Sequence, residues 1–193
     1  MFTSILIRIT PYWNSVVHRL KFERSYVVVQ HQTPDFNKAQ SEAEKLINQF
    51  EFTSAPIDPE QIAEGLGVDV LYAHFKPEVS KKLSGLIDIN NNRIIINKDI
   101  HPNRMIFTIA HELGHYIMHK DYAASNEYKT LPRHDNYAEN AKPAVEREAD
   151  AFAANLLMPA KLVRKYKDFA TVSELAKMFC VSEQAMRYRL NRV

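Results

Sequence analysis

HELGH, at residues 111–115, is the stretch of sequence that decides most about the fold and chemistry of this chain. Apolar residues recur at helical spacing on both sides of it, which predicts a partly buried helix from about residue 102 to residue 120. On such a helix, His111 and His115 lie on one face, about 6 Å apart along the axis. Both imidazoles can therefore reach the same metal ion.

Glu112 gives this pair of histidines a catalytic use. Zinc accepts neutral imidazole nitrogen at about 2.0–2.1 Å, and a catalytic zinc site keeps three protein ligands and one water. A glutamate beside the first ligand can act as general base toward that water, whose pKa the metal lowers toward about 7. HELGH therefore predicts Zn²⁺ on His111 and His115, with Glu112 as the catalytic base. The alternative is a chance match on an ordinary helix, and a third ligand decides between the two.

A second helix, predicted from about residue 144 to residue 158, supplies candidates for the third ligand. Glu146 and Asp150 are four residues apart and share one face of it, whereas Glu148 points elsewhere. We expect Glu146 to be the third metal ligand. Asp150 is expected to accept the outer N–H of a zinc-binding histidine, which fixes the orientation of the imidazole. The alternatives are Glu148 as the ligand, or three carboxylates on a solvated helix face.

Other polar side chains near HELGH are weaker candidates. His119 lies eight residues beyond His111, about 12 Å along the helix, so it is too far away to share the same ion and is expected at an edge or in the core. The segment from residue 121 to residue 143 is polar and lacks periodicity, and so long a connection is usually functional or mobile. The side chains that can reach a substrate from this region are Tyr116, Tyr128, His134 and Tyr137.

Gly114, inside the predicted metal helix, has two interpretations. Glycine lowers helix propensity by about 1 kcal/mol relative to alanine, so helix stability does not explain its presence. A close approach of the backbone at the metal site explains it, and so does tight packing against another helix. The sequence leaves both open.

The remainder of the core predicts an α+β fold, a mostly helical, zincin-like metallopeptidase domain with a small antiparallel sheet. Further helices are expected at about residues 38–51 and 58–65, and strands at residues 68–74, 83–89 and 93–97. Asp58 is expected to cap the second of these helices, with Pro59 at its first position. Asparagines at positions 90–92 tolerate left-handed conformations, so the last two strands are expected to form a hairpin.

Three parts of the chain are distinguished by their patterns. Residues 1–36 are expected to be an N-terminal extension of uncertain structure, and residues 37–170 the metallopeptidase domain. Residues 171–193 have the outline of a helix-turn-helix, a helical hairpin expected to pack on the domain. Thr171 and Glu174 predict a capping box at the start of this hairpin.

The second helix of that hairpin is basic. Arg187, Arg189 and Arg192 can contact DNA phosphates, which would give the hairpin a function in nucleic-acid binding. The alternative is a structural hairpin with arginines on its wet face. We favour the structural interpretation, because the turn lacks the frequent glycine and the whole chain is nearly neutral.

Composition excludes several classes of protein. Apolar residues make up 46% and charged residues 25%, which argues against disordered and fibrous chains. The net charge of +2 gives no global field for nucleic acid or an anionic membrane. No stretch approaches the roughly 18 apolar residues of a membrane-spanning helix. With the single cysteine, Cys180, no internal disulfide is possible, so a soluble, cytoplasmic protein without a membrane partner is expected.

Several segments together resemble the ImmA/IrrE family of zinc metallopeptidases. The run FTIAHELGH followed by IMH at residues 117–119 is similar to the active-site helix of that family. ExxAD at residues 146–150, leading into FAANLLMP, is similar to its second signature. The hairpin ahead of the metal helix and the closing LAKMFCVSEQAMRYRL also look like the family, so the resemblance covers about residues 38–192.

This resemblance implies both a site and a biological setting. The site is gluzincin-like, with zinc on His111, His115 and Glu146 and with Glu112 as general base. The substrate implied is a protein, a helix-turn-helix repressor of a mobile element or stress regulon that the peptidase cleaves or otherwise inactivates. The alternative is a regulator that binds DNA or a partner, or a toxin-antitoxin component, in which the zinc site is vestigial or structural.

Overall fold

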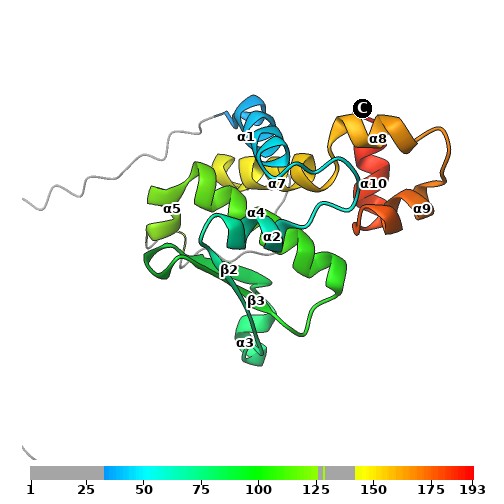
Figure 1. Cartoon of the computed structure of the whole chain (residues 1–193). Coiled ribbons are helices and arrows are strands. Elements are labelled where there is room, and N and C mark those ends of the chain that lie inside the picture. The colour runs from blue at the N-terminus through cyan, green and yellow to red at the C-terminus, as the bar shows by residue number, and fades with distance from the viewer. Residues whose placement is uncertain (1–32, 126–127, 129–141) are drawn as a thin grey trace, which may run out of the picture. The chain divides into compact units, whose positions relative to one another are not determined.

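The computed structural model describes residues 33–125, 128 and 142–193 (Figure 1). The extension predicted at residues 1–36 lies almost wholly outside these described residues, and so do His134 and Tyr137. The described residues all belong to one contact unit. The division of the chain into three parts therefore stays a prediction.

Helices at the predicted positions form most of the described structure, with ends that differ by a few residues. The helices are α1 (Phe36–Gln49), α2 (Pro59–Gly65), α3 (Pro77–Ser80), α4 (Pro102–Met118), α5 (Lys120–Ala124), α7 (Ala144–Leu157), α8 (Ala160–Tyr166), α9 (Val172–Met178) and α10 (Glu183–Leu190). The sequence does not predict α3, α5 and α8, because four to seven residues are too few to show a helical period and, unlike in α2 and α9, no capping side chain marks their start. No helix within the described ranges is long and apolar enough to cross a membrane.

Two predicted helix caps are confirmed. The side chain of Asp58 accepts hydrogen bonds from the backbone N–H groups of Glu60 and Gln61 at the start of α2. Thr171 and Glu174 form the reciprocal capping box at the start of α9. Each cap satisfies backbone donors that the first turn of a helix leaves without a partner.

The sheet has three strands, β1 (Asp69–Ala73), β2 (Gly85–Asp88) and β3 (Arg93–Asn97), in the order β1-β3-β2. β2 and β3 form the predicted antiparallel hairpin, with Asn92 in the left-handed region at φ 46°. β1, however, runs parallel to β3, so the sheet is mixed. The prediction of a purely antiparallel sheet is wrong in this respect. The chain between β1 and β3 contains α3 and β2, and this long crossover allows the parallel arrangement.

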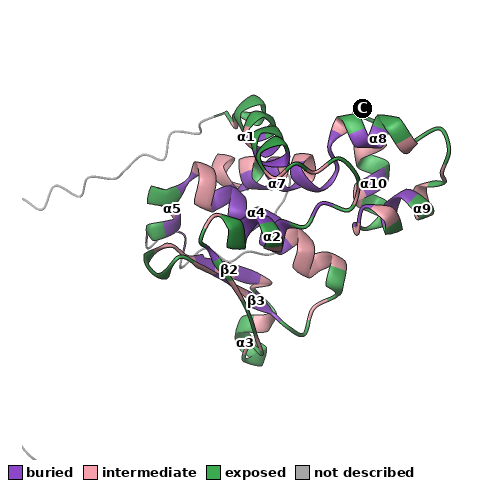
Figure 2. Ribbon diagram, viewed as in Figure 1, coloured by how far each residue is buried: buried purple, intermediate pink, exposed green. Residues whose placement is uncertain are grey.

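α4 lies at the centre of this unit. It contacts β2 and β3 of the sheet as well as α7, and α1 packs against α7 (Figure 1). Buried residues concentrate along α4 and α7 (Figure 2). Ile109 and Leu113 of α4, Phe152 of α7 and Ile94 of β3 are among the largest fully buried side chains. Burial of each such side chain stabilises the fold by about 1.5–3 kcal/mol, so core packing sets the position of α4 relative to α7.

Gly114 faces α7 at this contact. A Cβ atom placed on Gly114 would lie 3.0 Å from Cδ1 of Phe152 and 3.4 Å from Cα of Ala149. The first of these distances is shorter than an ordinary van der Waals contact, so a side chain here would push the two helices apart. The structure therefore supports the tight-packing interpretation of Gly114.

The C-terminal hairpin is joined to the rest of the unit by hydrogen bonds. Arg189 of α10 donates to the carbonyl oxygen of Met158 at 2.8 Å and to Oδ1 of Asn155 at 2.9 Å. Asn103, at the start of α4, donates to the carbonyl oxygen of Val181 in the turn of the hairpin at 3.0 Å. These bonds support the predicted packing of the hairpin on the domain.

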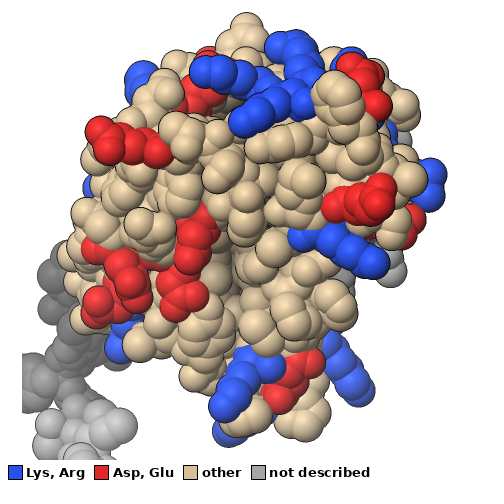
Figure 3. All heavy atoms as spheres, turned by 45° about the vertical axis from the view of Figure 1, so that its right-hand side comes forward, with Lys and Arg blue, Asp and Glu red and all other residues tan. Residues whose placement is uncertain are grey.

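The other two arginines predicted as DNA contacts also have partners within the chain. Arg187 pairs with Glu183 at 3.2 Å, and the guanidinium of Arg192 lies 3.9 Å from the ring centroid of Tyr188. Figure 3, which brings this end of the molecule forward, shows acidic and basic side chains on the same face. The arrangement favours the structural interpretation of the hairpin over a phosphate-binding one.

Replacing Gly114 with valine is expected to lower the free energy of unfolding by about 1–3 kcal/mol, because the branched side chain would overpack the contact with Phe152. Urea denaturation of the metal-free protein measures this difference. Ser41→Val, at an exposed position of α1, is the control, because it introduces the same side chain into a helix without filling the core. Equal stability of the two variants would contradict tight packing at Gly114.

Candidate metal centre

The three predicted metal ligands come together between α4 and α7. His111 and His115 lie one turn apart on α4, and Glu146 lies on the first turn of α7. All three are buried, with 8%, 0% and 2% of their surfaces exposed. One ligand atom from each lies within 4.8 Å of the other two. The packing of α7 on α4 thus places a carboxylate beside the two histidines, as the sequence predicts.

The spacing of these ligand atoms suits a tetrahedral ion. The Nε2 atoms of His111 and His115 are 3.2 Å apart, and each lies 3.3 Å from a different carboxylate oxygen of Glu146. Four ligands placed about 2.0–2.1 Å from a central zinc ion are separated from one another by about 3.3–3.4 Å. Two imidazole nitrogens and a carboxylate are also a donor set that zinc accepts. The residues therefore fit a metal ion of this type.

Asp150 supports His111 from outside this group. Its Oδ1 atom lies 3.0 Å from Nδ1 of His111, the ring nitrogen that faces away from His115 and Glu146. The ammonium group of Lys142 contacts the other oxygen of Asp150. The geometry is the one expected for a carboxylate that accepts the outer N–H of a metal-binding histidine.

His119 and Glu148 have a place near the site that the sequence analysis does not predict. Nδ1 of His119 lies 3.3 Å from Nδ1 of His115, and Nε2 of His119 lies 2.7 Å from Oε2 of Glu148. Glu148 and His119 thus lie outside the group of three candidate ligands, and His119 is buried, as one of its two expected positions requires. The sequence feature that could have predicted the contact of His119 with His115 is the repeated spacing of four residues between His111, His115 and His119, which puts each histidine beside the next.

Charge interactions shift several pKa values in the metal-free site. Burial lowers the pKa of His111, but the carboxylates of Asp150 and Glu146 outweigh it and raise the pKa to about 9. Burial also lowers the pKa of His115, and there Glu146 does not fully compensate. For Glu146, hydrogen bonds from the two histidines outweigh burial and hold the pKa far below its usual range. Glu146 is therefore a carboxylate, which is the form that binds a cation.

Glu112, the predicted general base, is 1% exposed and is held by Tyr128. The Tyr128 hydroxyl donates to Oε2 of Glu112 at 2.5 Å and accepts from the backbone N–H of Ile87 in β2 at 2.7 Å. Because the hydroxyl has a single proton, the direction of both bonds is fixed. Tyr128 is one of four weaker candidates in the sequence, and the structure shows that it contacts Glu112 directly.

Aromatic rings enclose the buried side of His115. The ring centroids of Tyr122 and Tyr128 lie 5.6 Å and 5.5 Å from that of His115, and Tyr122 donates a hydrogen bond to Oε1 of Glu146 at 3.0 Å. Tyr116, in contrast, lies outside this cluster, with the ammonium of Lys120 4.2 Å from its ring centroid. Rings packed this closely restrict the orientations open to the metal ligands.

A cavity of about 400 Å³ adjoins this cluster beside β2, one of the two outer strands of the sheet. Its lining is mainly apolar and includes Leu83, Leu86, Ile87, Ile89, Ala123 and Tyr128. Tyr128 thus belongs to both the cavity and the hydrogen bond to Glu112. A peptide side chain of moderate size can be accommodated at this place.

Comparison with known proteins identifies a family for most of the chain. Residues 63–191 match the family described as IrrE N-terminal-like domain. The radiation response metalloprotease IrrE of Deinococcus deserti is 29% identical over 130 residues, which are 64% of this chain and 44% of that protein. The chain therefore spans less than half the length of this relative.

Two further comparisons concern a phage protein and a solved structure. Uncharacterized immunity region protein 2 of Bacillus phage phi105 is 28% identical over 123 residues, covering 63% of this chain and 72% of that protein. The structure of a Mycobacterium tuberculosis transcriptional regulator superimposes with a TM-score of 0.57 and 18% identity, covering 80% of this chain and 46% of that one. At this identity the structural likeness concerns the fold alone.

Tyr128→Phe is expected to lower the free energy of unfolding of the metal-free protein by about 1–3 kcal/mol, because it removes a buried hydroxyl that joins Glu112 to β2. Thermal denaturation followed by circular dichroism measures the loss. Tyr116→Phe is the matched control and is expected to change stability by less than about 0.5 kcal/mol. If both variants melt together with the wild-type protein, the hydroxyl bridge contributes nothing to the fold.

Proposed function

We propose that this chain, which belongs to the IrrE N-terminal-like domain family, is a zinc-dependent endopeptidase. The observation that carries the proposal is the group formed by His111, His115 and Glu146, in which the facing nitrogen and oxygen atoms are 3.2–3.3 Å apart. The outer nitrogen of each histidine is also engaged, by Asp150 in one case and His119 in the other. Such outer contacts are typical of metal-binding histidines.

Zinc is the metal that this donor set favours. Imidazole nitrogen also suits other transition metals, but two imidazoles and one carboxylate with a position left for water is the arrangement of many catalytic zinc sites. When bound, zinc would supply Lewis acidity that polarises a carbonyl and makes a water acidic. His111, His115 and Glu146 would hold it.

The other residues of the site prepare Glu112 for proton transfer. Tyr128 occupies one oxygen of the Glu112 carboxylate and anchors it to the backbone of β2, so the carboxylate has a fixed orientation. A fixed carboxylate can accept a proton from the attacking water and deliver it to the leaving amine. The apolar cavity beside β2 suits a side chain of a polypeptide substrate, since the side chains of a bound peptide enter pockets.

The substrate that we propose is a helix-turn-helix repressor of a mobile element or stress regulon. The motifs of residues 107–119 and 146–159, which resemble those of repressor-inactivating peptidases, support it. A phage relative whose name places it in an immunity region supports it as well. Direct DNA binding by the C-terminal hairpin is the second candidate, but the engagement of Arg187, Arg189 and Arg192 within the chain weighs against it.

Glu112→Gln is expected to retain zinc and to lose cleavage, with the turnover number reduced at least about 100-fold, because the amide cannot accept the proton. Multiple-turnover cleavage of a helix-turn-helix repressor that the wild-type protein cleaves, followed by mass spectrometry of the fragments, measures the change. Zinc content by elemental analysis is the accompanying control. A turnover number of Glu112→Gln equal to that of the wild-type protein would contradict the proposed role of Glu112.

Glu146→Ala is expected to reduce zinc content to well below one ion per chain, because two histidines without the carboxylate leave the site with two protein ligands. Elemental analysis after dialysis against metal-free buffer measures it. Glu78→Ala, at an exposed position of α3, is the control for loss of a carboxylate elsewhere. Full zinc retention in the Glu146 variant would reject this residue as a ligand.

DNA binding and repressor cleavage are separated by one further measurement. The proposal expects no sequence-specific binding of the isolated protein to the operator of a repressor that it cleaves, even at low salt, where phosphate contacts are strongest. Fluorescence anisotropy with operator and scrambled duplexes measures this. Tight, salt-dependent preference for the operator would favour the regulator over the peptidase.

A further inference from the structure

We propose that His119 and Glu148 are positioning residues for the metal ligand His115, in a hydrogen-bonded chain that ends at the first residues of α1. The inference rests on the proposed zinc site and adds to it a link between the metal and a helix distant in sequence. His119 follows the last residue of α4, and Glu148 lies in α7. Neither belongs to the group of His111, His115 and Glu146, whose ligand atoms lie within 4.8 Å of one another.

The positions of the protons follow from the arrangement of the rings. Nε2 of His115 faces Nε2 of His111 and Oε1 of Glu146, so a metal bound there leaves the proton of His115 on Nδ1. That Nδ1–H can donate to Nδ1 of His119, 3.3 Å away. His119 then carries its own proton on Nε2 and donates it to Oε2 of Glu148 at 2.7 Å. Each donor in this chain meets one acceptor.

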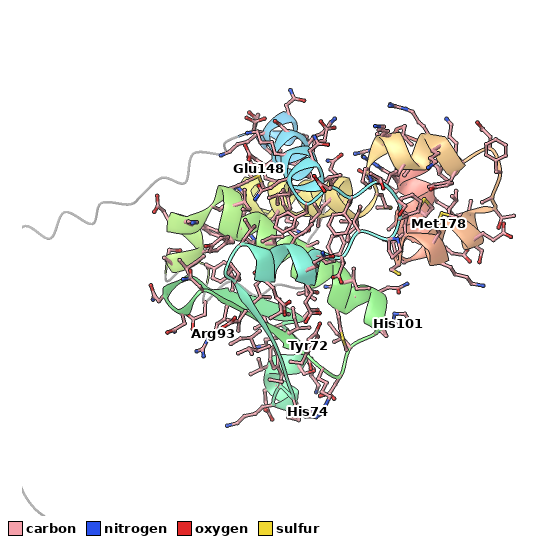
Figure 4. All side chains as sticks on the ribbon, in the orientation of Figure 1. Tyr72, His74, Arg93, His101, Glu148 and Met178 are labelled. Carbon is pink, nitrogen blue, oxygen red and sulfur yellow. The ribbon has the colours of Figure 1, made fainter. Side chains whose placement is uncertain are left out.

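Glu148 closes the chain against the backbone of α1. Its second oxygen, Oε1, accepts the N–H of Asp35 at 2.7 Å, and Asp35 is the capping residue of α1. Glu148 lies where α7 meets the start of α1 (Figure 4). Both carboxylate oxygens therefore have a donor, one from α1 and one from His119. The orientation of Glu148 is set from two sides.

Burial makes these bonds effective. His115 is 0% and His119 9% exposed, and the Glu148 side chain is 14% exposed. Hydrogen bonds in such a shielded environment are stronger than in water, and a charged acceptor at the end polarises the chain. The negative charge of Glu148 thus increases the electron density on Nε2 of His115, where the metal would bind.

The two metal-binding histidines are therefore supported differently. The outer nitrogen of His111 contacts the carboxylate of Asp150 directly, whereas the outer nitrogen of His115 is linked to the carboxylate of Glu148 through the imidazole of His119. The longer chain connects α4, α7 and α1, so the position of the start of α1 affects the metal ligand. Loss of either intermediate residue is expected to weaken metal binding even though neither touches the ion.

Zinc dissociation constants, measured by competition with a chromophoric chelator, test the inference on the full-length chain. Glu148→Gln and His119→Phe are each expected to weaken zinc binding about 10–100-fold. His119→Gln keeps an amide that can accept and donate, so it is expected to recover most of the affinity. The double variant His119→Phe/Glu148→Gln is expected to be no weaker than the weaker single variant, because the two residues act in series.

A spectroscopic measurement separates positioning from a general structural effect. The visible absorption of the Co²⁺-loaded protein reports the geometry of the ligands, and it is expected to change in His119→Phe and not in the surface control Glu78→Gln. Unchanged zinc affinity and an unchanged Co²⁺ spectrum in Glu148→Gln would overturn the inference. This variant also decides the matter if His119→Phe does not fold. If the Glu146→Ala variant bound zinc as tightly as the wild-type protein, that result would instead reject the proposed site itself.

Discussion

The close packing of α7 on α4 is the contact on which the remainder of the site depends. Gly114 lets the two helices approach until the Phe152 ring would be only 3.0 Å from an added Cβ. At this separation Glu146 reaches both histidines of α4, and the group closes to interatomic distances of 3.2–3.3 Å. A wider spacing would leave two histidines on one helix and a carboxylate on another.

Three carboxylates of α7 contact three histidines, two in α4 and one at its C-terminal cap. Glu146 lies against His111 and His115, Asp150 takes the outer nitrogen of His111, and Glu148 takes His119. Buried hydrogen bonds offset part of the cost of removing these groups from water. The same contacts hold the imidazoles in the orientation that a metal ion would need.

The sheet and the C-terminal hairpin show what local patterns cannot reveal. Alternating residues identify strands, but nothing in residues 69–73 states that β1 pairs with β3 and runs parallel to it. Likewise, the sequence shows Arg189 only as a basic side chain on a helix. Its hydrogen bonds to Met158 and Asn155 in the structure show that it holds the hairpin to α7. Both features depend on partners that are distant in sequence.

The sequence by itself determined most of the helices, the caps at Asp58 and Thr171 and the candidate ligands, because helical periodicity, capping residues and a spacing of four residues are local properties. His111, His115, Glu146 and Asp150 followed from such spacings, and the structure brings them together. The place of Tyr128 on Glu112, and the chain through His119 and Glu148 to α1, were decided only by the tertiary structure. The physical reason is that each joins elements whose mutual distance is set by core packing, and no periodicity within one segment encodes that distance.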